Sequence, residues 1–241
     1  MPPNMPPEAD RVLVDKVVLA NRILYRQGVV DGFGHVSVRH PQSPSHFLLA
    51  RNMAPALVRR DDIVTFDLDG TALDAAGRRI YLERFIHGEI YRARPDVQSV
   101  VHSHSPSVIP FGVTGTVLQP VFHMGGFLGE GSALFEIRDV ADDTDMLISN
   151  GGLGAALAAT LGSRSAVLMR GHGSTVVGSS IEQAVYRAYY AEVNARLQLQ
   201  AKQLGEVTYL NAKEAAKAAA INDTQLQRVW ELWAREIGPV D

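Results

Sequence analysis

Apolar residues recur along the chain at two spacings, one typical of amphipathic helices and one typical of short buried strands. The helical spacing predicts helices over 10–27, 83–94, 106–113, 180–204 and 223–237, and the glycine-rich segment after Ser149 opens another that ends near Gly162. Shorter apolar runs predict strands over 35–39, 47–50, 63–67, 97–104, 117–122, 145–149 and 165–169. Because short strands and helices alternate without an internal repeat or a linker, the pattern indicates one α/β domain.

Several element boundaries are marked by residues with a local mechanism. The helix over 83–94 is expected to stop before Pro95, because a residue that precedes proline disfavours the helical conformation. Ser180 is a good N-cap, and Glu182 favours the first turn of the long helix that follows it. The D-L-D-G sequence at 67–70 suits a hairpin turn. These signals indicate where the chain turns between the predicted elements.

Composition favours a soluble globular protein. The 241 residues are 46% hydrophobic and 20% charged, which is enough for a sizeable core. Residues 1–9 are proline-rich and are expected to form a disordered tail, with one domain over 10–241. The formal net charge of −3 offers no attraction to nucleic acid, and no apolar run reaches the roughly 18 residues of a membrane span. We therefore expect no nucleic-acid or membrane partner and a cytoplasmic location.

Candidate chemistry is concentrated in histidines, because the chain contains no cysteine and any metal site must use nitrogen and oxygen ligands. The apolar strand over 97–104 ends in an H-S-H sequence. Side chains alternate along a strand, so His102 and His104 are expected on one face, about 7 Å apart. Neutral imidazole is the commonest metal ligand, and this face therefore predicts part of a metal site.

A third histidine and a carboxylate extend this hypothesis. His172 follows the strand over 165–169 and stands between Gly171 and Gly173, where the backbone can approach a neighbour closely. Glu83 lies upstream in the sequence YLERFIH, as a candidate acid/base or fourth ligand. Three protein ligands with an open position are typical of a catalytic metal site rather than a structural one.

Four motifs occur in the order of a known family. GHVSVR, E-R-F-I-H, Y-x-x-x-P-D-V-x-S-V-V-H-S-H-S and R-G-H-G together resemble the class II aldolase/adducin family over nearly the whole chain. The resemblance implies a single-domain α/β fold in three layers, with a central, mainly antiparallel sheet flanked by helices. It also implies His102, His104 and His172 as metal ligands, Glu83 as the catalytic acid/base, and a homotetramer with active sites at subunit interfaces.

The chain departs from the sugar-phosphate aldolases of this family where those enzymes hold phosphate. The corresponding positions here look like Gly34–His35, Arg51–Asn52 and Tyr81–Leu82. The last pair, just before the catalytic glutamate, stands where the aldolases have small hydroxyl residues that hold phosphate. Arg51 carries a planar fork that suits a carboxylate. GHVSVR, FLLAR and FHMGGFLG resemble instead a branch that decarboxylates hydroxylated aromatic or pyridine dicarboxylates. This implies a small carboxylate substrate, with these residues expected to bind it: His35, Ser37, Arg51, Asn52 and His123.

The leading hypothesis is a metal-dependent carbon–carbon lyase that decarboxylates a hydroxylated aromatic or hydroxypyridine carboxylate in aromatic catabolism. One divalent metal per subunit is expected, Mn²⁺ or Zn²⁺, with Fe²⁺ or Co²⁺ as alternatives. Glu83 would protonate the ring carbon, which requires that burial by Leu82, Phe85 and Ile86 raises its pKa.

The same residues support other functions. A retro-aldolase that acts on a non-phosphorylated hydroxy-keto acid is the main alternative, and an epimerase that uses the same metal is a third. A non-enzymatic adducin-like module is disfavoured, because a convergent polar cluster is costly in a scaffold that does no chemistry.

Three residues have a structural alternative to a role at the site. Arg51 could be a solvated surface arginine, and His123 could be a packed structural histidine. His87 shares a helix face with Glu83 and is expected to support the site by packing or hydrogen bonding rather than to bind the metal.

Overall fold

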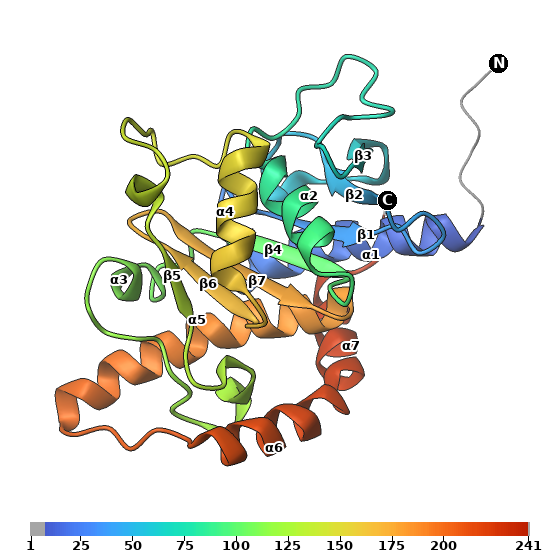
Figure 1. The fold of residues 1–241 in the computed structure, drawn as a ribbon. Helices are drawn as coiled ribbons and strands as arrows, with labels where there is room; N and C mark the ends of the chain where they lie inside the picture. Colours follow the sequence, from blue (N-terminus) through green and yellow to red (C-terminus); the bar gives the residue numbers. More distant parts are fainter. Residues whose placement is uncertain (1–7, 241) are drawn as a thin grey trace.

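One open sheet forms the centre of the molecule. The computed structural model describes residues 8–240. Seven strands pair in the order β3-β2-β1-β4-β7-β6-β5, and every neighbouring pair is antiparallel except β5 with β6 (Figure 1). The strands are β1 (His35–Arg39), β2 (His46–Ala50), β3 (Ile63–Asp67), β4 (Ser99–Ser103), β5 (Ala133–Phe135), β6 (Ala166–Met169) and β7 (Gly173–Gly178). The predicted α/β fold with a mainly antiparallel central sheet is confirmed.

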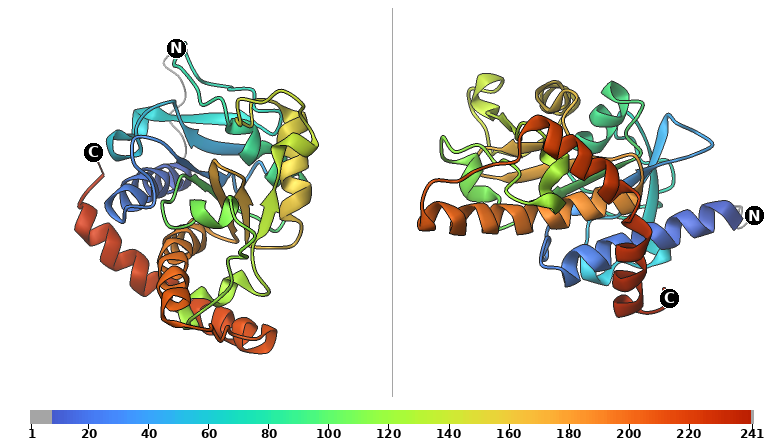
Figure 2. Two further views of the ribbon diagram at one scale, coloured as in Figure 1. Left: turned by 90° about the vertical axis from the view of Figure 1, so that its left-hand side faces the viewer. Right: turned by 90° about the horizontal axis from the view of Figure 1, so that it is seen from below.

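Helices cover both faces of the sheet, so the domain has three layers (Figure 2). On one face, α1 (Glu8–Arg26), α5 (Ile181–Leu204) and α7 (Leu226–Ile237) contribute to a shared apolar core. On the other face, α2 (Arg84–Ala93) and α4 (Gly151–Leu161) lie side by side (Figure 1). Within residues 8–240, no helix is both long enough and apolar enough to cross a membrane.

Short helices complete the architecture at the ends of the strands and along the loops. The remaining α-helices are α3 (Ile109–Gly112) and α6 (Ala212–Asp223). The 3₁₀ helices are η1 (Pro55–Leu57), η2 (Arg60–Asp62), η3 (His123–Leu128) and η4 (Ile137–Asp139). Of these, η3 packs against α6 and α5.

The central strands β4 and β7 are buried on both faces, which explains their valine-rich sequences. Val101 and Val176 enter the core under α1 and α5, whereas Val100 and Val177 enter the core under α2 and α4. Because side chains alternate, His102 lies on the same face as Val100. The strand pattern therefore places this histidine on the side of α2 and α4.

Most predicted elements are found within a few residues of their expected bounds, but two predicted strands are wrong. Segments 117–122 and 145–149 pair with no strand, and the sheet instead contains β5 and β7, which the apolar pattern did not indicate. β7 is bounded by Gly173 and Gly178, which obscure its short apolar run. Residues 1–7 of the expected tail lie outside the described residues, and Glu8 already begins α1.

Segment 117–122 is apolar like a strand, but its backbone groups form hydrogen bonds with side chains of α5. Asn194 accepts a hydrogen bond from the Val121 N–H at 3.0 Å and donates one to the Gln119 carbonyl at 2.8 Å. Gln198 accepts from the Gln119 N–H and donates to the Val117 carbonyl in the same way. Both amides are fully buried. The backbone groups that a ladder would satisfy are thus satisfied by two side chains that lie far away in the sequence.

We expect Asn194→Ala to destabilise the protein by about 2–4 kcal/mol, because two buried backbone groups lose their partner. Urea unfolding followed by circular dichroism measures the change. Gln203→Ala on the exposed side of the same helix is the control and should change stability little. An Asn194→Ala protein as stable as the unmodified one would contradict this account of segment 117–122.

Candidate metal centre

β4 supplies two of the clustered histidines. His102 is the fourth residue of the strand, and His104 follows one residue after the strand ends. Their Nε2 atoms lie 3.3 Å apart, so the two rings point to the same place, as the alternation of side chains predicts. His102 is buried beneath the helices, whereas His104 is only partly buried. The pair therefore forms one wall of a site at the end of β4.

The turn between β6 and β7 delivers His172. Gly171 has a φ of +62°, a left-handed conformation that suits glycine, and the His172 N–H closes the turn on the Met169 carbonyl at 3.1 Å. At Gly173 a Cβ atom would lie 2.2 Å from the Ser103 carbonyl oxygen, so only glycine lets β7 begin this close to β4. His172 Nε2 consequently lies 3.0 Å from His104 Nε2.

Glu83 reaches the same point from the opposite wall. It is the N-cap residue of α2, and its side chain is buried. Its Oε2 atom lies 3.5 Å from the Nε2 atoms of both His102 and His172, and its Oε1 accepts a hydrogen bond from the Ile148 N–H at 3.0 Å. One ligand atom from each of the four residues lies within 4.8 Å of every other. Glu83 and His172, which are 89 positions apart in the sequence, thus belong to one cluster.

The donor set fits a divalent metal ion. A carbonyl can only accept, so the contact of 2.9 Å between His172 Nδ1 and the Met146 oxygen places the ring proton on Nδ1. The Nε2 lone pair of His172 therefore points at the other donors. Convergent nitrogen lone pairs and a carboxylate repel one another unless a cation lies between them. Three imidazoles and one carboxylate are ligands that Zn²⁺, Mn²⁺, Fe²⁺ and Co²⁺ all accept.

Burial and neighbouring charges shift the pKa of the donors. Burial lowers the pKa of His102 to about 3, so this imidazole is neutral near pH 7. Burial raises the pKa of Glu83, but the adjacent imidazoles and a backbone N–H outweigh burial and lower the pKa to about 2. Burial likewise lowers the pKa of His172, yet the Glu83 carboxylate and the Met146 carbonyl together raise it above 6.5. The expectation that burial makes Glu83 a neutral acid is therefore wrong.

An irregular loop before α4 orients two of the donors, and the apolar pattern misread it as a strand. Met146 has a φ of +72°, which is uncommon for a residue with a side chain, and this conformation turns its carbonyl toward His172. Two residues later, the Ile148 N–H holds Glu83. Hydrogen bonds of this kind fix the tautomer and the direction of metal ligands. In a strand paired on both sides, these backbone groups would instead be bonded to the neighbouring strands.

A buried hydrogen-bond network lies next to His102. The Ser37 hydroxyl contacts Tyr91 Oη at 2.7 Å and His87 Nδ1 at 2.6 Å, and His87 Nε2 contacts His35 Nδ1 at 2.7 Å. The His35 ring lies 5.1 Å from the His102 ring, centroid to centroid. The Ser37 hydroxyl, which was expected to bind substrate, is thus bonded to His87. His87 in turn supports the site by a hydrogen bond to His35, as the sequence indicated.

The other residues expected to bind substrate lie outside this cluster in the described chain. The Arg51 guanidinium pairs with Asp62 at 2.6 Å and lines a separate cavity of about 490 Å³. Asn52 has an exposed side chain, and its backbone N–H donates to the Arg79 carbonyl. His123 is exposed at the start of η3, where its carbonyl accepts a hydrogen bond from Asn222 of α6.

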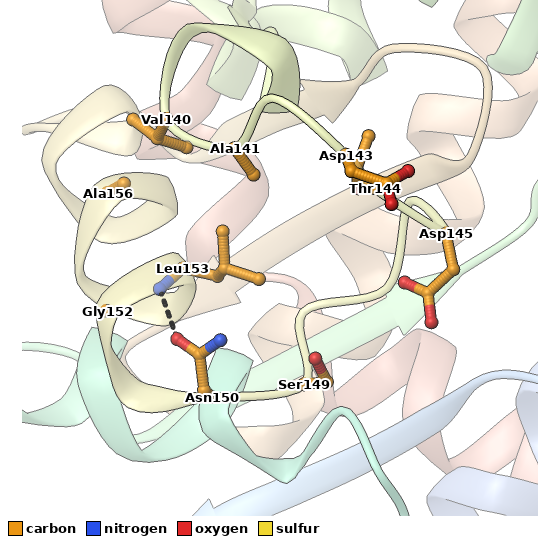
Figure 3. A pocket seen from close by; sticks show the side chains of 10 residues that line it. All are labelled: Val140, Ala141, Asp143, Thr144, Asp145, Ser149, Asn150, Gly152, Leu153 and Ala156. Atoms are coloured by element: carbon orange, nitrogen blue, oxygen red, sulfur yellow. Dashed lines mark hydrogen bonds between the residues drawn. The ribbon is translucent and has the colours of Figure 1, made fainter.

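A larger cavity of about 780 Å³ lies beside the loop that leads into α4 (Figure 3). Asp143, Asp145 and Leu153 line it, together with Asn150, whose side chain caps α4 through the Leu153 N–H at 3.0 Å. None of the four metal donors lines this cavity. The same loop contacts the donor cluster through the Met146 carbonyl and the Ile148 N–H.

Comparison with known proteins agrees with this architecture. Residues 15–199 match the model of the class II aldolase and adducin N-terminal domain. The decarboxylase tropJ of Talaromyces stipitatus is 38% identical over 89% of this chain and 90% of its own length. The 3,4-dihydroxyphthalate decarboxylase of Arthrobacter keyseri is 33% identical over 79% of each chain.

A solved structure shares the fold over almost the whole molecule. The L-fuculose 1-phosphate aldolase of Glaciozyma antarctica PI12 superposes with a TM-score of 0.77 at 26% identity, covering 97% of this chain and 93% of the aldolase. Together, the family match and the decarboxylase relatives support an enzyme of the lyase class. The chain belongs to the class II aldolase and adducin family, as the order of its motifs predicted.

Proposed function

We propose that this lyase is a divalent-metal-dependent decarboxylase of a hydroxylated aromatic or hydroxypyridine carboxylate. The observation that carries the proposal is the convergence of three imidazoles and one carboxylate within 4.8 Å in a chain that is 38% identical to a decarboxylase. The name of the 3,4-dihydroxyphthalate decarboxylase supports the substrate class. A role in the breakdown of aromatic compounds follows from that class.

His102, His104 and His172 would hold the metal through their Nε2 atoms, with Glu83 as a neighbour or fourth ligand. When bound, the metal supplies Lewis acidity that stabilises negative charge on a substrate oxygen. Mn²⁺ and Zn²⁺ are the first choices, and Fe²⁺ and Co²⁺ suit the same donors. The Met146 carbonyl keeps His172 in the tautomer that binding requires.

Glu83 is ionised, so it must first act as a base. Its carboxylate takes the proton of the substrate hydroxyl and returns it to the ring carbon that carries the carboxylate. The bond between that carbon and the carboxylate then breaks, carbon dioxide leaves, and the electron pair restores the aromatic ring. The oxygen that gave up its proton is left as a phenolate, and it takes one proton from water when the product leaves. Because the proton on the ring carbon comes from the substrate hydroxyl, the sequence accommodates a glutamate whose pKa is low.

The structure gives unequal support to the five residues that were expected to bind substrate. His35 has the best support, because its ring centroid lies 5.1 Å from that of His102. Ser37 would act through His87, by fixing the orientation of His35. Roles for Arg51, Asn52 and His123 stay predictions that rest on the family resemblance.

The assembly is likewise proposed from the family. A catalytic domain over 10–241 would form a homotetramer with active sites at subunit interfaces and act on a small-molecule carboxylate in the cytoplasm. The exposed apolar side chain of Leu82, next to Glu83, is compatible with a subunit contact beside the site.

A retro-aldolase that acts on a non-phosphorylated hydroxy-keto acid is the second candidate. The structural similarity to an L-fuculose 1-phosphate aldolase favours it, because aldol cleavage also leaves an electron pair that must be stabilised on oxygen. The decarboxylase reaction has the stronger support, because the two curated relatives described above are named decarboxylases.

The metal site is tested by His102→Ala. We expect the variant to lose most of the one metal ion per subunit, because a buried imidazole at the centre of the donor set is removed. Elemental analysis after dialysis against Mn²⁺ or Zn²⁺ gives the stoichiometry. His123→Ala, which removes an exposed histidine outside the cluster, should keep the metal. Full and tight occupancy in His102→Ala would refute the assignment.

Metal affinity should fall as the pH is lowered, because a proton on His172 competes with the metal. His172 has a pKa above 6.5, whereas the pKa values of His102 and Glu83, about 3 and about 2, leave both deprotonated at pH 6. Below the raised pKa, the dissociation constant for Zn²⁺ should approach a tenfold rise per pH unit. Calorimetric titrations from pH 8 to pH 5.5 test this, and a flat affinity would contradict it.

The reaction is tested by the release of carbon dioxide from dihydroxybenzoates, dihydroxyphthalates and hydroxypyridine dicarboxylates incubated with the metal-loaded protein. We expect turnover in this panel and none with sugar phosphates. Glu83→Gln keeps an acceptor for the Ile148 N–H but cannot take a proton, so kcat should fall by roughly 10²-fold or more. Loss of metal in Glu83→Gln would make Glu83 a ligand, and turnover of only hydroxy-keto acids would favour the aldolase.

A further inference from the structure

An exposed aromatic ring stands at the edge of the donor cluster. Phe33 is 69% exposed, the most exposed phenylalanine among the large hydrophobic residues on the described surface. Its ring centroid lies 6.2 Å from that of His104, with an angle of 32° between the rings. Phe33 belongs to neither apolar core. Fold stability therefore does not explain why an apolar ring occupies this position.

The loop that carries Phe33 is held in place. The Asp31 carboxylate accepts a hydrogen bond from the Phe33 N–H at 2.8 Å, and the Asp31 N–H donates to the Phe33 carbonyl at 3.3 Å. The next residue, Gly34, has a φ of +95°, and a Cβ atom there would lie 3.1 Å from the His102 carbonyl oxygen. The loop backbone thus packs against β4 at a proposed metal ligand, and the base of the phenylalanine side chain is fixed.

A fixed and exposed ring beside a metal site is suited to contact a ligand. Aromatic rings attract one another in offset or tilted arrangements with centroids about 4.5–7 Å apart, the range in which Phe33 and His104 lie. His102 and Glu83 are buried, whereas His104 is only partly buried, so a substrate from solvent approaches the Nε2 cluster beside His104. Phe33 is next to His104 on the open side, because its own ring is exposed.

We propose that Phe33 stacks against the ring of the substrate and thereby selects aromatic over aliphatic carboxylates. This inference rests on the proposed function, since it names how the same site recognises its substrate class. An aliphatic hydroxy-keto acid offers the same oxygen atoms but no aromatic face. It gains less from Phe33, which makes this residue a determinant of specificity rather than of chemistry.

Binding is measured by calorimetry on the metal-loaded protein with two probes, 2,3-dihydroxybenzoate and glycolate, which share oxygen donors but differ in the ring. Phe33→Leu keeps an apolar side chain and removes the aromatic face. We expect it to weaken 2,3-dihydroxybenzoate binding by roughly 3- to 10-fold and to leave glycolate binding unchanged. Phe33→Tyr keeps an aromatic ring and should bind 2,3-dihydroxybenzoate as tightly as the unmodified protein does. Leu232→Ala removes an exposed apolar side chain on α7 and should leave the affinity for both probes unchanged.

Kinetics and metal content separate this inference from the proposed function. In Phe33→Leu the metal stoichiometry should be unchanged, and KM for the aromatic substrate should rise more than kcat falls. The unmodified protein could decarboxylate aromatic acids while Phe33→Leu binds both probes with unchanged affinity. That result would overturn the stacking role and leave the proposed function standing. Equal weakening of both probes would also overturn the stacking role. If the unmodified protein neither binds 2,3-dihydroxybenzoate nor releases carbon dioxide from any aromatic acid, the proposed function fails and the stacking role fails with it.

Discussion

The pairing of β4 with β1 on one side and β7 on the other is the interaction on which the site depends. β4 carries His102 and His104 to its end, and its register with β1 sets His35 directly opposite His102. Its register with β7 sets Ser174 opposite Ser103, so the turn that bears His172 opens next to His104. A shift of one residue in either ladder would move every side chain of the strand to the other face of the sheet. The donor cluster is therefore a product of strand register.

The donor cluster also places four polar side chains in a largely buried region, where each needs a partner. Burial holds His102 neutral, whereas the surrounding imidazoles keep Glu83 ionised. The network of Tyr91, Ser37 and His87 then satisfies polar atoms beneath the site, in a region where an unpaired group would be costly. This arrangement leaves the convergent lone pairs of the donors as the feature that a cation would stabilise.

Decarboxylation and aldol cleavage make the same demand on this cluster, because each breaks a carbon–carbon bond and leaves electrons that an oxygen must carry. The family relationship explains how one scaffold is similar both to a sugar-phosphate aldolase and to decarboxylases. What distinguishes the reactions must then lie around the donors rather than among them. Phe33 lies beside His104, and Tyr81 and Leu82 directly precede Glu83 in the sequence.

The sequence by itself determined the class of fold and the residues of the cluster. Alternation along a strand is a local property, so His102 and His104 were predictable as a pair, and the motifs around Glu83 and His172 linked them to a family. Only the tertiary structure decided the contacts between distant segments. The amides of Asn194 and Gln198 turned one apolar run into a loop, and the left-handed Met146 turned another into a support for His172. It also placed Arg51 against Asp62 and lowered the pKa of Glu83, because both outcomes depend on neighbours that chain order does not reveal.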